Sequence, residues 1–311
     1  MTSAGPSVAP LRIREVLASV SEALGSGPEA RWIVAHATGT RTGDLLAAPD
    51  IVVAPAVSDD VHDIVDRCLA GEPLQYVLGT WAFRALELQV DPRVLIPRPE
   101  TEHVVGVALG ELTAQRSRLS VGSRVVAVDL GTGSGAIALS LAGEFETAPE
   151  RAPPGSIEVW ATDESLGALE VFGLNLAALA QRSPQAAARV RVAQGSWFDA
   201  LAPDLAGKVH LVVSNPPYVS ESEWDALDPV VRDYEPIAAL VPGRTGFEAI
   251  ETLLTEAPRW LAPGGSLVVE LAPAQARSTR DRADALGYEQ PQVRDDLAGR
   301  PRVLVARRPD A

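Results

Sequence analysis

A continuous apolar run that leads directly into a glycine-rich turn is the feature that most constrains the fold of this chain. Residues 124–129 read Arg-Val-Val-Ala-Val-Asp, and residues 130–135 read Leu-Gly-Thr-Gly-Ser-Gly. The first run is typical of a strand buried on both faces of a parallel sheet. An apolar helix is expected directly afterwards, at residues 136–142. Glycines permit the tight turn between them and let a ligand approach the unpaired amides at the helix start.

Further strand patterns follow along the chain and alternate with helical patterns. The predicted strands comprise residues 157–162, 190–193, 209–214, 266–271, 292–294 and 302–306. This alternation predicts a doubly wound, Rossmann-like α/β domain that binds ligands at the carboxyl ends of its strands. A stretch with prolines and glutamates, residues 144–156, is expected to be a surface loop.

The amino-terminal part of the chain has a different pattern. Between residues 11 and 70 apolar residues recur at three- and four-residue spacing, which predicts a small helical bundle. Two alternating runs, residues 74–79 and 83–90, predict a β-hairpin. The prolines of residues 95–102 are expected to open the next helix. We therefore expect a helical domain at residues 1–72, a hairpin linker at 73–97 and a catalytic domain at 98–311.

Composition and charge argue against several classes of protein. The formal net charge of −14 repels a phosphate backbone and favours a protein substrate over stable nucleic-acid binding. No apolar run is long enough to cross a bilayer, and the first residues lack the apolar core of a secretion signal, so we expect a cytoplasmic protein. With a single cysteine, Cys68, and four histidines at no ligand spacing, neither a disulfide nor a metal site is expected. A monomer is expected.

The glycine turn and an acidic residue after the next strand together predict a nucleotide-type site. Asp163 follows the strand at residues 157–162, where a carboxylate can accept two hydrogen bonds from ribose hydroxyls. The glycine spacing is G-x-G-x-G, whereas dinucleotide sites have G-x-G-x-x-G. That spacing favours S-adenosylmethionine over NAD as the cofactor. The predicted cofactor-binding residues are Gly131, Thr132, Gly133, Ser134, Gly135, Asp163, Trp197 and Asn215.

Two residues beside this site have structural alternatives. Asp129 is expected to hold the amides of the glycine turn through charge-assisted hydrogen bonds. Trp197 is expected either to lie against the adenine ring or to be an aromatic residue of the core.

The segment Asn215-Pro216-Pro217-Tyr218 follows an apolar strand and is the most specific motif of the chain. Its two prolines make the loop rigid. The side-chain oxygen of Asn215 and the carbonyl of Pro216 can accept both hydrogens of a planar NH₂ group and turn its nitrogen toward a sulfonium methyl. Tyr218 is expected to cover the acceptor and exclude water. We predict Asn215, Pro216 and Tyr218 as catalytic residues, Pro217 as a further substrate contact, and no catalytic histidine.

Motifs along nearly the whole chain resemble the peptide chain release factor glutamine methyltransferase family. They are residues 71–76 with Gly79, 95–102, 129–135, Asp163, 215–218 and 296–300. The resemblance implies a class I S-adenosylmethionine-dependent methyltransferase that modifies the glutamine amide in the Gly-Gly-Gln motif of class I release factors. It also implies that residues 131–135, Asp163, Trp197 and Asn215 contact the cofactor and that residues 215–218 hold the glutamine. The amino-terminal domain would help dock the release factor.

Other functions share parts of this pattern. The loop at residues 215–218 also resembles those of nucleic-acid adenine amino-methyltransferases and of the ribosomal-protein glutamine methyltransferase, and the upstream segments favour the release-factor enzymes. A degenerate fold that only binds a partner is a further alternative, against which the intact glycine turn argues. One departure from the family is Leu-Ala-Pro-Ala at residues 271–274, after Glu270, where polar residues such as histidine are usual.

Overall fold

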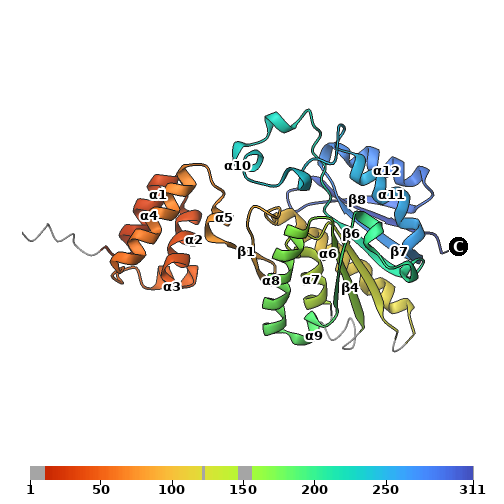
Figure 1. The fold of residues 1–311 in the computed structure, drawn as a ribbon, viewed down its shortest axis with the longest axis horizontal. Helices are drawn as coiled ribbons and strands as arrows, with labels where there is room; N and C mark the ends of the chain where they lie inside the picture. The colour runs from red at the N-terminus through yellow and green to blue at the C-terminus, as the bar shows by residue number, and fades with distance from the viewer. Residues whose placement is uncertain (1–10, 121–122, 146–155, 311) are drawn as a thin grey trace, which may run out of the picture. The chain divides into compact units, whose positions relative to one another are not determined.

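The computed structural model describes residues 11–120, 123–145 and 156–310 and divides into two compact units (Figure 1). One unit ends at Gly79 and also includes Pro229–Tyr234, while the other comprises Thr80–Asp228 and continues from Glu235. The surface loop expected at residues 144–156 falls almost entirely outside the described residues, and the expected domain limits stay predictions. Within the described ranges, no helix is long and apolar enough to cross a membrane.

Short helices make up the first unit. They are α1 Ile13–Leu24, α2 Gly27–Thr38, α3 Thr42–Ala47, α4 Pro55–Leu69, α5 Leu74–Leu78 and α10 Pro229–Arg232. The Ser26 side chain caps α2 by accepting a hydrogen bond from the Glu29 amide at 3.4 Å, and Gly25 ends α1 with a φ of 66°. The buried side chains pack into one core around Ile33 and Leu45, which confirms the predicted helical bundle.

The prediction of a strand at residues 74–79 is wrong. Leu74–Leu78 form helix α5, which Pro73 precedes and Gly79 ends with a φ of 70°. The Gly79 amide donates to the carbonyls of Gln75 and Tyr76. Because Leu74 and Val77 are three residues apart, one helical face buries both in the core of the first unit. Burial of this pair selects the helix for a run whose alternation fits a strand equally well.

A hairpin does follow, but both of its strands lie after this helix. It consists of β1 Thr80–Phe83 and β2 Leu86–Gln89, which pair antiparallel with Thr80 opposite Gln89. Arg84 lies in the turn between them with a φ of 51°. The second predicted run, residues 83–90, therefore contributes the turn and the second strand.

A seven-stranded sheet forms the centre of the second unit, in the order β5-β4-β3-β6-β7-β9-β8. All neighbouring pairs are parallel except those of β9 with β7 and β8. The first strand of the sheet, β3, lies between β4 and β6, so the winding direction reverses there and the carboxyl ends diverge into a crevice. The strands are β3 Val125–Leu130, β4 Ile157–Asp163, β5 Val190–Gln194, β6 Val209–Ser214, β7 Leu261–Glu270, β8 Glu289–Asp295 and β9 Pro301–Arg307.

Helices cover both faces of this sheet, which confirms the predicted doubly wound α/β fold (Figure 1). Helices α6, α7 and α8 pack on one face, and α11 and α12 pack on the other. On the second face, Val128 and Leu267 from the sheet meet Ile250 and Leu253 from α11 in a fully buried core. The helices of this unit are α6 Pro99–Arg118, α7 Ala136–Glu144, α8 Leu166–Arg182, α9 Pro184–Ala187, α11 Glu248–Trp260 and α12 Ala276–Ala285.

Candidate active site

A cavity of about 470 Å³ lies at the carboxyl ends of β3, β4 and β6, where the winding direction of the sheet reverses. Its volume is within the range of roughly 300–1,000 Å³ that small-molecule sites occupy. Eight of the predicted site residues line it: Gly131, Thr132, Gly133, Ser134, Asp163, Trp197, Asn215 and Pro217. Three predicted site residues, Gly135, Pro216 and Tyr218, are not part of this lining.

The turn between β3 and α7 needs its glycines for two different reasons. Gly131, Gly133 and Gly135 have φ values of 70°, 55° and 90°, all in the left-handed region that disfavours other residues. At Gly135 a Cβ would also lie 2.7 Å from the ring of Phe172. Gly135 therefore packs the turn against α8, while Gly131 and Gly133 leave the backbone open toward the cavity.

Asp129, near the end of β3, contacts this turn through its side-chain carboxylate. Its Oδ2 accepts hydrogen bonds from the Thr132 hydroxyl at 2.7 Å and from the Ala138 amide at 3.0 Å. The side chain is fully buried, and burial raises its pKa to about 7. Asp129 therefore binds the turn through the Thr132 hydroxyl and α7 through the Ala138 amide, whereas the Gly133 amide of the turn donates to Asp163.

Asp163 lies at the end of β4 and reaches the same turn from the other side. Its Oδ2 accepts a hydrogen bond from the Gly133 amide at 2.9 Å, and its Oδ1 accepts one from the Ser165 amide at 2.9 Å. Burial raises its pKa. Each carboxylate oxygen can accept more than one hydrogen bond, so Asp163 can hold Gly133 and still receive a donor from the cavity.

Trp197 lies between the cavity and the core, and its contact with adenine stays a prediction. It lines the cavity and also packs against the core of the α11 face. Its φ of 44° is unusual for a residue with a bulky side chain. Such a conformation costs roughly 1–3 kcal/mol, which the packing around the residue must offset.

The residue before the loop that follows β6 is held in place by a hydrogen bond to β3. The Ser214 hydroxyl donates to the carbonyl of Leu130 at 2.7 Å, which joins the ends of β6 and β3. The Asn215 Nδ2 then donates to the Thr101 hydroxyl at 3.2 Å, and that hydroxyl donates to Glu270 at 2.7 Å. Tyr218 is partly buried, and burial raises its pKa, while its backbone carbonyl accepts a hydrogen bond from Gln275.

Sequence reasoning missed Thr101 and Glu270 as site residues. Thr101 stands between two charged residues, Glu100 and Glu102, in the segment that was expected to open a helix. In the structure those charges bind elsewhere, Glu100 to Arg300 and Glu102 to the Arg84 amide, and the uncharged Thr101 lines the cavity. The signal available in the sequence was the position of Thr101 in the first turn after Pro97 and Pro99.

A second missed part of the site is the segment before α11. Pro236, Ala238, Ala239, Val241 and Pro242 all line the cavity. Glu235, just before them, is buried and accepts hydrogen bonds from the Arg98 side chain and the Ile96 amide. Burial raises the pKa of Glu235, and Arg98 opposes that shift. This ion pair between the buried Glu235 and the partly exposed Arg98 ties the segment to the residues that precede α6.

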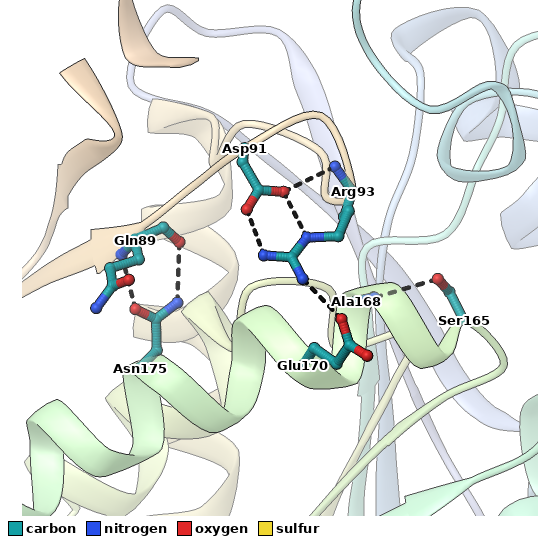
Figure 2. A network of polar contacts seen from close by, with 7 residues as sticks. All are labelled: Gln89, Asp91, Arg93, Ser165, Ala168, Glu170 and Asn175. Atoms are coloured by element: carbon teal, nitrogen blue, oxygen red, sulfur yellow. Dashed lines mark hydrogen bonds and ion pairs between the residues drawn. The ribbon is translucent and has the colours of Figure 1, made fainter. Parts of the chain in front are cut away.

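The edge of the cavity is tied to α8 by a polar network (Figure 2). Arg93, which lines the cavity, lies between Asp91 and Glu170, and its side chain donates to both carboxylates. Nearby, the buried Asn175 of α8 accepts from the Gln89 amide at 2.7 Å and donates to the Gln89 carbonyl at 3.0 Å. Helix α8 therefore holds both the hairpin strand β2 and Arg93 at the edge of the cavity.

The fold and this site define a class I methyltransferase: a mainly parallel α/β sheet, a glycine-lined cavity at its switch point and an Asn-Pro-Pro-Tyr loop at the rim. Residues 15–79 match the family model described as the PrmC N-terminal domain. The release factor glutamine methyltransferase of Moorella thermoacetica is 37% identical over 305 residues, covering 96% of this chain and 99% of that protein.

Two further proteins extend the comparison. The release factor glutamine methyltransferase of Streptomyces coelicolor is 39% identical over 286 residues, covering 90% of each chain. A crystal structure of the release factor-specific protein-(glutamine-N5) methyltransferase from Alicyclobacillus acidocaldarius is 24% identical, with a TM-score of 0.35, and covers 71% of this chain and 99% of that one. The chain belongs to the release factor glutamine methyltransferase family.

Proposed function

We propose that this enzyme transfers the methyl group of S-adenosylmethionine to the side-chain amide nitrogen of the glutamine in the Gly-Gly-Gln motif of class I peptide chain release factors. The observation that carries the proposal is that one cavity is lined by the glycine turn, by Asp163 and by Asn215. Membership of the family directs the proposal to release factors.

The residues of the cavity fit S-adenosylmethionine. Gly131 and Gly133 leave the backbone bare where the glycine turn meets the cavity, and a Cβ at Gly133 would meet nothing within 4 Å. Asp163 offers acceptor oxygens for ribose hydroxyls, and Trp197 offers an aromatic surface for adenine. When bound, the cofactor supplies an electrophilic methyl group on a sulfonium.

The loop after β6 would hold the acceptor amide. An amide nitrogen is a poor nucleophile, so orientation is the main contribution that the protein can make, worth on the order of 7–11 kcal/mol for a well-aligned pair. The Asn215 Oδ1 and the Pro216 carbonyl accept the two N–H hydrogens, and Pro217 and Tyr218 cover the planar group. Methylation leaves the nitrogen acidic enough to release one proton to water, so no histidine is needed.

The direct test is incubation of the purified protein with methyl-labelled S-adenosylmethionine and a release factor. We expect label on the release factor and none on a variant whose Gly-Gly-Gln glutamine is replaced by alanine. Asn215→Ala should reduce transfer by at least about 100-fold, because it removes one acceptor of the amide hydrogens. Equal labelling of the two release factors, or preferred labelling of ribosomal protein or DNA, would reject the proposal.

We further propose that the helical residues 1–72 dock the release factor, that the enzyme is a monomer, and that it works in the cytoplasm. Deleting the docking contacts should raise KM for the intact release factor and leave KM for a short Gly-Gly-Gln peptide unchanged. Steady-state kinetics with both substrates checks this, using charge-reversal variants of exposed residues on α1 and α4. An equal effect on both substrates would remove the helices from docking.

A further inference from the structure

Three elements bring one side chain each into contact beside the cavity, and two of these side chains, Thr101 and Asn215, line it. Thr101 is in the first turn of α6, Asn215 follows β6, and Glu270 ends β7. Strands β6 and β7 are parallel neighbours with Ser214 opposite Val269, so the next residue of each, Asn215 and Glu270, lies at the same edge of the sheet. The first turn of α6 places Thr101 within hydrogen-bond distance of both.

These three side chains form a continuous chain of hydrogen bonds. The Asn215 Nδ2 donates to Thr101 Oγ1 at 3.2 Å, and Thr101 Oγ1 donates to Glu270 Oε2 at 2.7 Å. Thr101 and Glu270 are almost completely buried, with exposed fractions of 3% and 1%. A buried polar chain of this kind holds its members in one arrangement because each broken bond leaves an unpaired group.

The donor and acceptor roles in this series of hydrogen bonds follow from the chemistry of Glu270, its last member. An ionised carboxylate only accepts hydrogen bonds, so the single proton of the Thr101 hydroxyl must point to Glu270. That hydroxyl can then only accept from Asn215, and among the two ends of the Asn215 amide only the NH₂ can donate. The amide is planar, so its oxygen occupies the opposite corner.

We propose that Thr101 and Glu270 are positioning residues that set the orientation of the Asn215 amide, so that its oxygen and not its NH₂ group meets the acceptor amide. This inference rests on the proposed function, because an oxygen at that corner is what an acceptor NH₂ group requires. With the amide reversed, two NH₂ groups would face each other and the acceptor would lose a partner.

The charge state of Glu270 controls the direction of the chain. Burial raises the pKa of Glu270 to about 7, Thr101 and the cations Arg302 and Arg98 oppose the shift, and Glu100 adds to it. Tyr218, from the loop after β6, also faces Glu270. A protonated Glu270 can donate to the Thr101 hydroxyl, which frees the hydroxyl proton for the Asn215 oxygen. The reversed arrangement then becomes available as the pH falls below about 7.

Kinetics with paired variants test the positioning role. Thr101→Val keeps the shape and removes the hydroxyl, and we expect kcat for methyl transfer to fall by about 10- to 100-fold with cofactor affinity within about three-fold of wild type. Thr101→Ser restores the hydroxyl and should recover most of the activity. Thr113→Val is the matched control, because Thr113 is in the same helix and its hydroxyl donates only to the Leu109 carbonyl. Its activity should equal that of wild type.

Glu270→Gln supplies a readout that a purely structural role would not change. At saturating cofactor, wild-type kcat should rise with pH through about 7, and in the Gln variant, which has no ionisable group at this position, it should be independent of pH over the same range. Asp129 has a pKa of about 7 as well, but Glu270→Gln leaves it in place. Retained kcat in Thr101→Val, equal losses in Thr101→Val and Thr101→Ser, or an unchanged pH profile in Glu270→Gln would each overturn the proposal.

A measurement without substrate separates this inference from the proposed function. The side-chain NH₂ signals of Asn215 in ¹⁵N-labelled protein can be assigned by their loss in Asn215→Ala. We expect Thr101→Val to shift them and Thr113→Val to leave them in place, and we expect them to titrate through about pH 7 in wild type but not in Glu270→Gln. Asn215 signals that respond neither to Thr101→Val nor to pH would contradict the proposed series of hydrogen bonds. If wild type shows these responses but methylates no glutamine, the proposed function is wrong and the hydrogen bonds from Asn215 through Thr101 to Glu270 are still supported.

Discussion

At the scale of single residues, the site contains two buried carboxyl groups that are costly to ionise. Burial raises the pKa of Asp129 and of Glu270 to about 7 each, compared with values of about 4 in an unfolded chain. The folded protein therefore binds these protons more tightly than the unfolded chain does. Their contribution to stability falls as the pH rises from about 4 to about 7 and stays low above that.

Asp129→Asn should therefore change how stability depends on pH. From about pH 5 to about pH 8 the free energy of unfolding of wild type should fall, and part of this fall should be absent in the variant because an asparagine side chain has no charge to bury. Urea denaturation at both pH values measures the difference. Asp225→Asn, at an exposed position, is the control and should parallel wild type. Parallel curves for Asp129→Asn would contradict the assignment of the pH dependence to Asp129.

At the scale of elements, substitution by alanine should destabilise the protein to different degrees at two glycines of the same turn. Gly133→Ala meets only the strain of a φ of 55°, since a Cβ there meets nothing within 4 Å. Gly135→Ala meets a φ of 90° and also places a Cβ 2.7 Å from the Phe172 ring and 2.9 Å from the Leu139 side chain. We expect Gly135→Ala to lose about 1–3 kcal/mol more stability than Gly133→Ala, measured by urea denaturation. Equal losses would show that α8 can move away from the turn.

The contact between α8 and β2 is a second case at this scale (Figure 2). Asn175 is buried and makes three hydrogen bonds, two with the backbone of Gln89 and one with the carbonyl of Ser134 at 2.8 Å. Asn175→Ala leaves these groups unpaired and should cost about 2–4 kcal/mol. Gln181→Ala on the exposed side of the same helix should change stability by less than about 0.5 kcal/mol.

Asn175→Asp distinguishes the donor bonds from the acceptor bond. An aspartate can still accept from the Gln89 amide but cannot donate to the two carbonyls, so its loss of stability should be close to that of Asn175→Ala. Thermal denaturation of the three variants compares them. An aspartate variant as stable as wild type would mean that the two donor bonds contribute little.

At the scale of the whole molecule, the two compact units have separate hydrophobic cores. Ile33 lies in the core of the first unit and Leu267 in the core of the second, and both are fully buried. Each change to alanine should cost about 2–5 kcal/mol in its own unit. We expect calorimetry to show that Ile33→Ala and Leu267→Ala lower different unfolding transitions. S-adenosylmethionine affinity should stay within about two-fold in Ile33→Ala. A single transition lowered by both changes would show that the units unfold together.

Much of the fold follows from local patterns. The strands at residues 125–130 and 209–214 and the left-handed turn at Gly131, Gly133 and Gly135 were predictable, because burial on both faces of a sheet and a positive φ leave direct marks in residue type. The strand predicted at residues 74–79 was wrong because a short run with Leu74, Tyr76 and Val77 buries apolar side chains as a strand or as a helix. Only the core of the first unit selects between them.

The candidate site also has features that the sequence predicts and features that only the tertiary structure shows. By itself the sequence determined that Asp163 and Asn215 lie at the carboxyl ends of strands of a doubly wound sheet beside a glycine turn, because the carboxyl ends of parallel strands share one edge. The tertiary structure alone decided that Thr101 joins Asn215 and Glu270, and that residues 236–242 close the cavity. Thr101 is 114 residues from Asn215 and 169 from Glu270. Hydrogen bonds over such separations are created by packing α6 onto the sheet, and no local pattern of residue types records them.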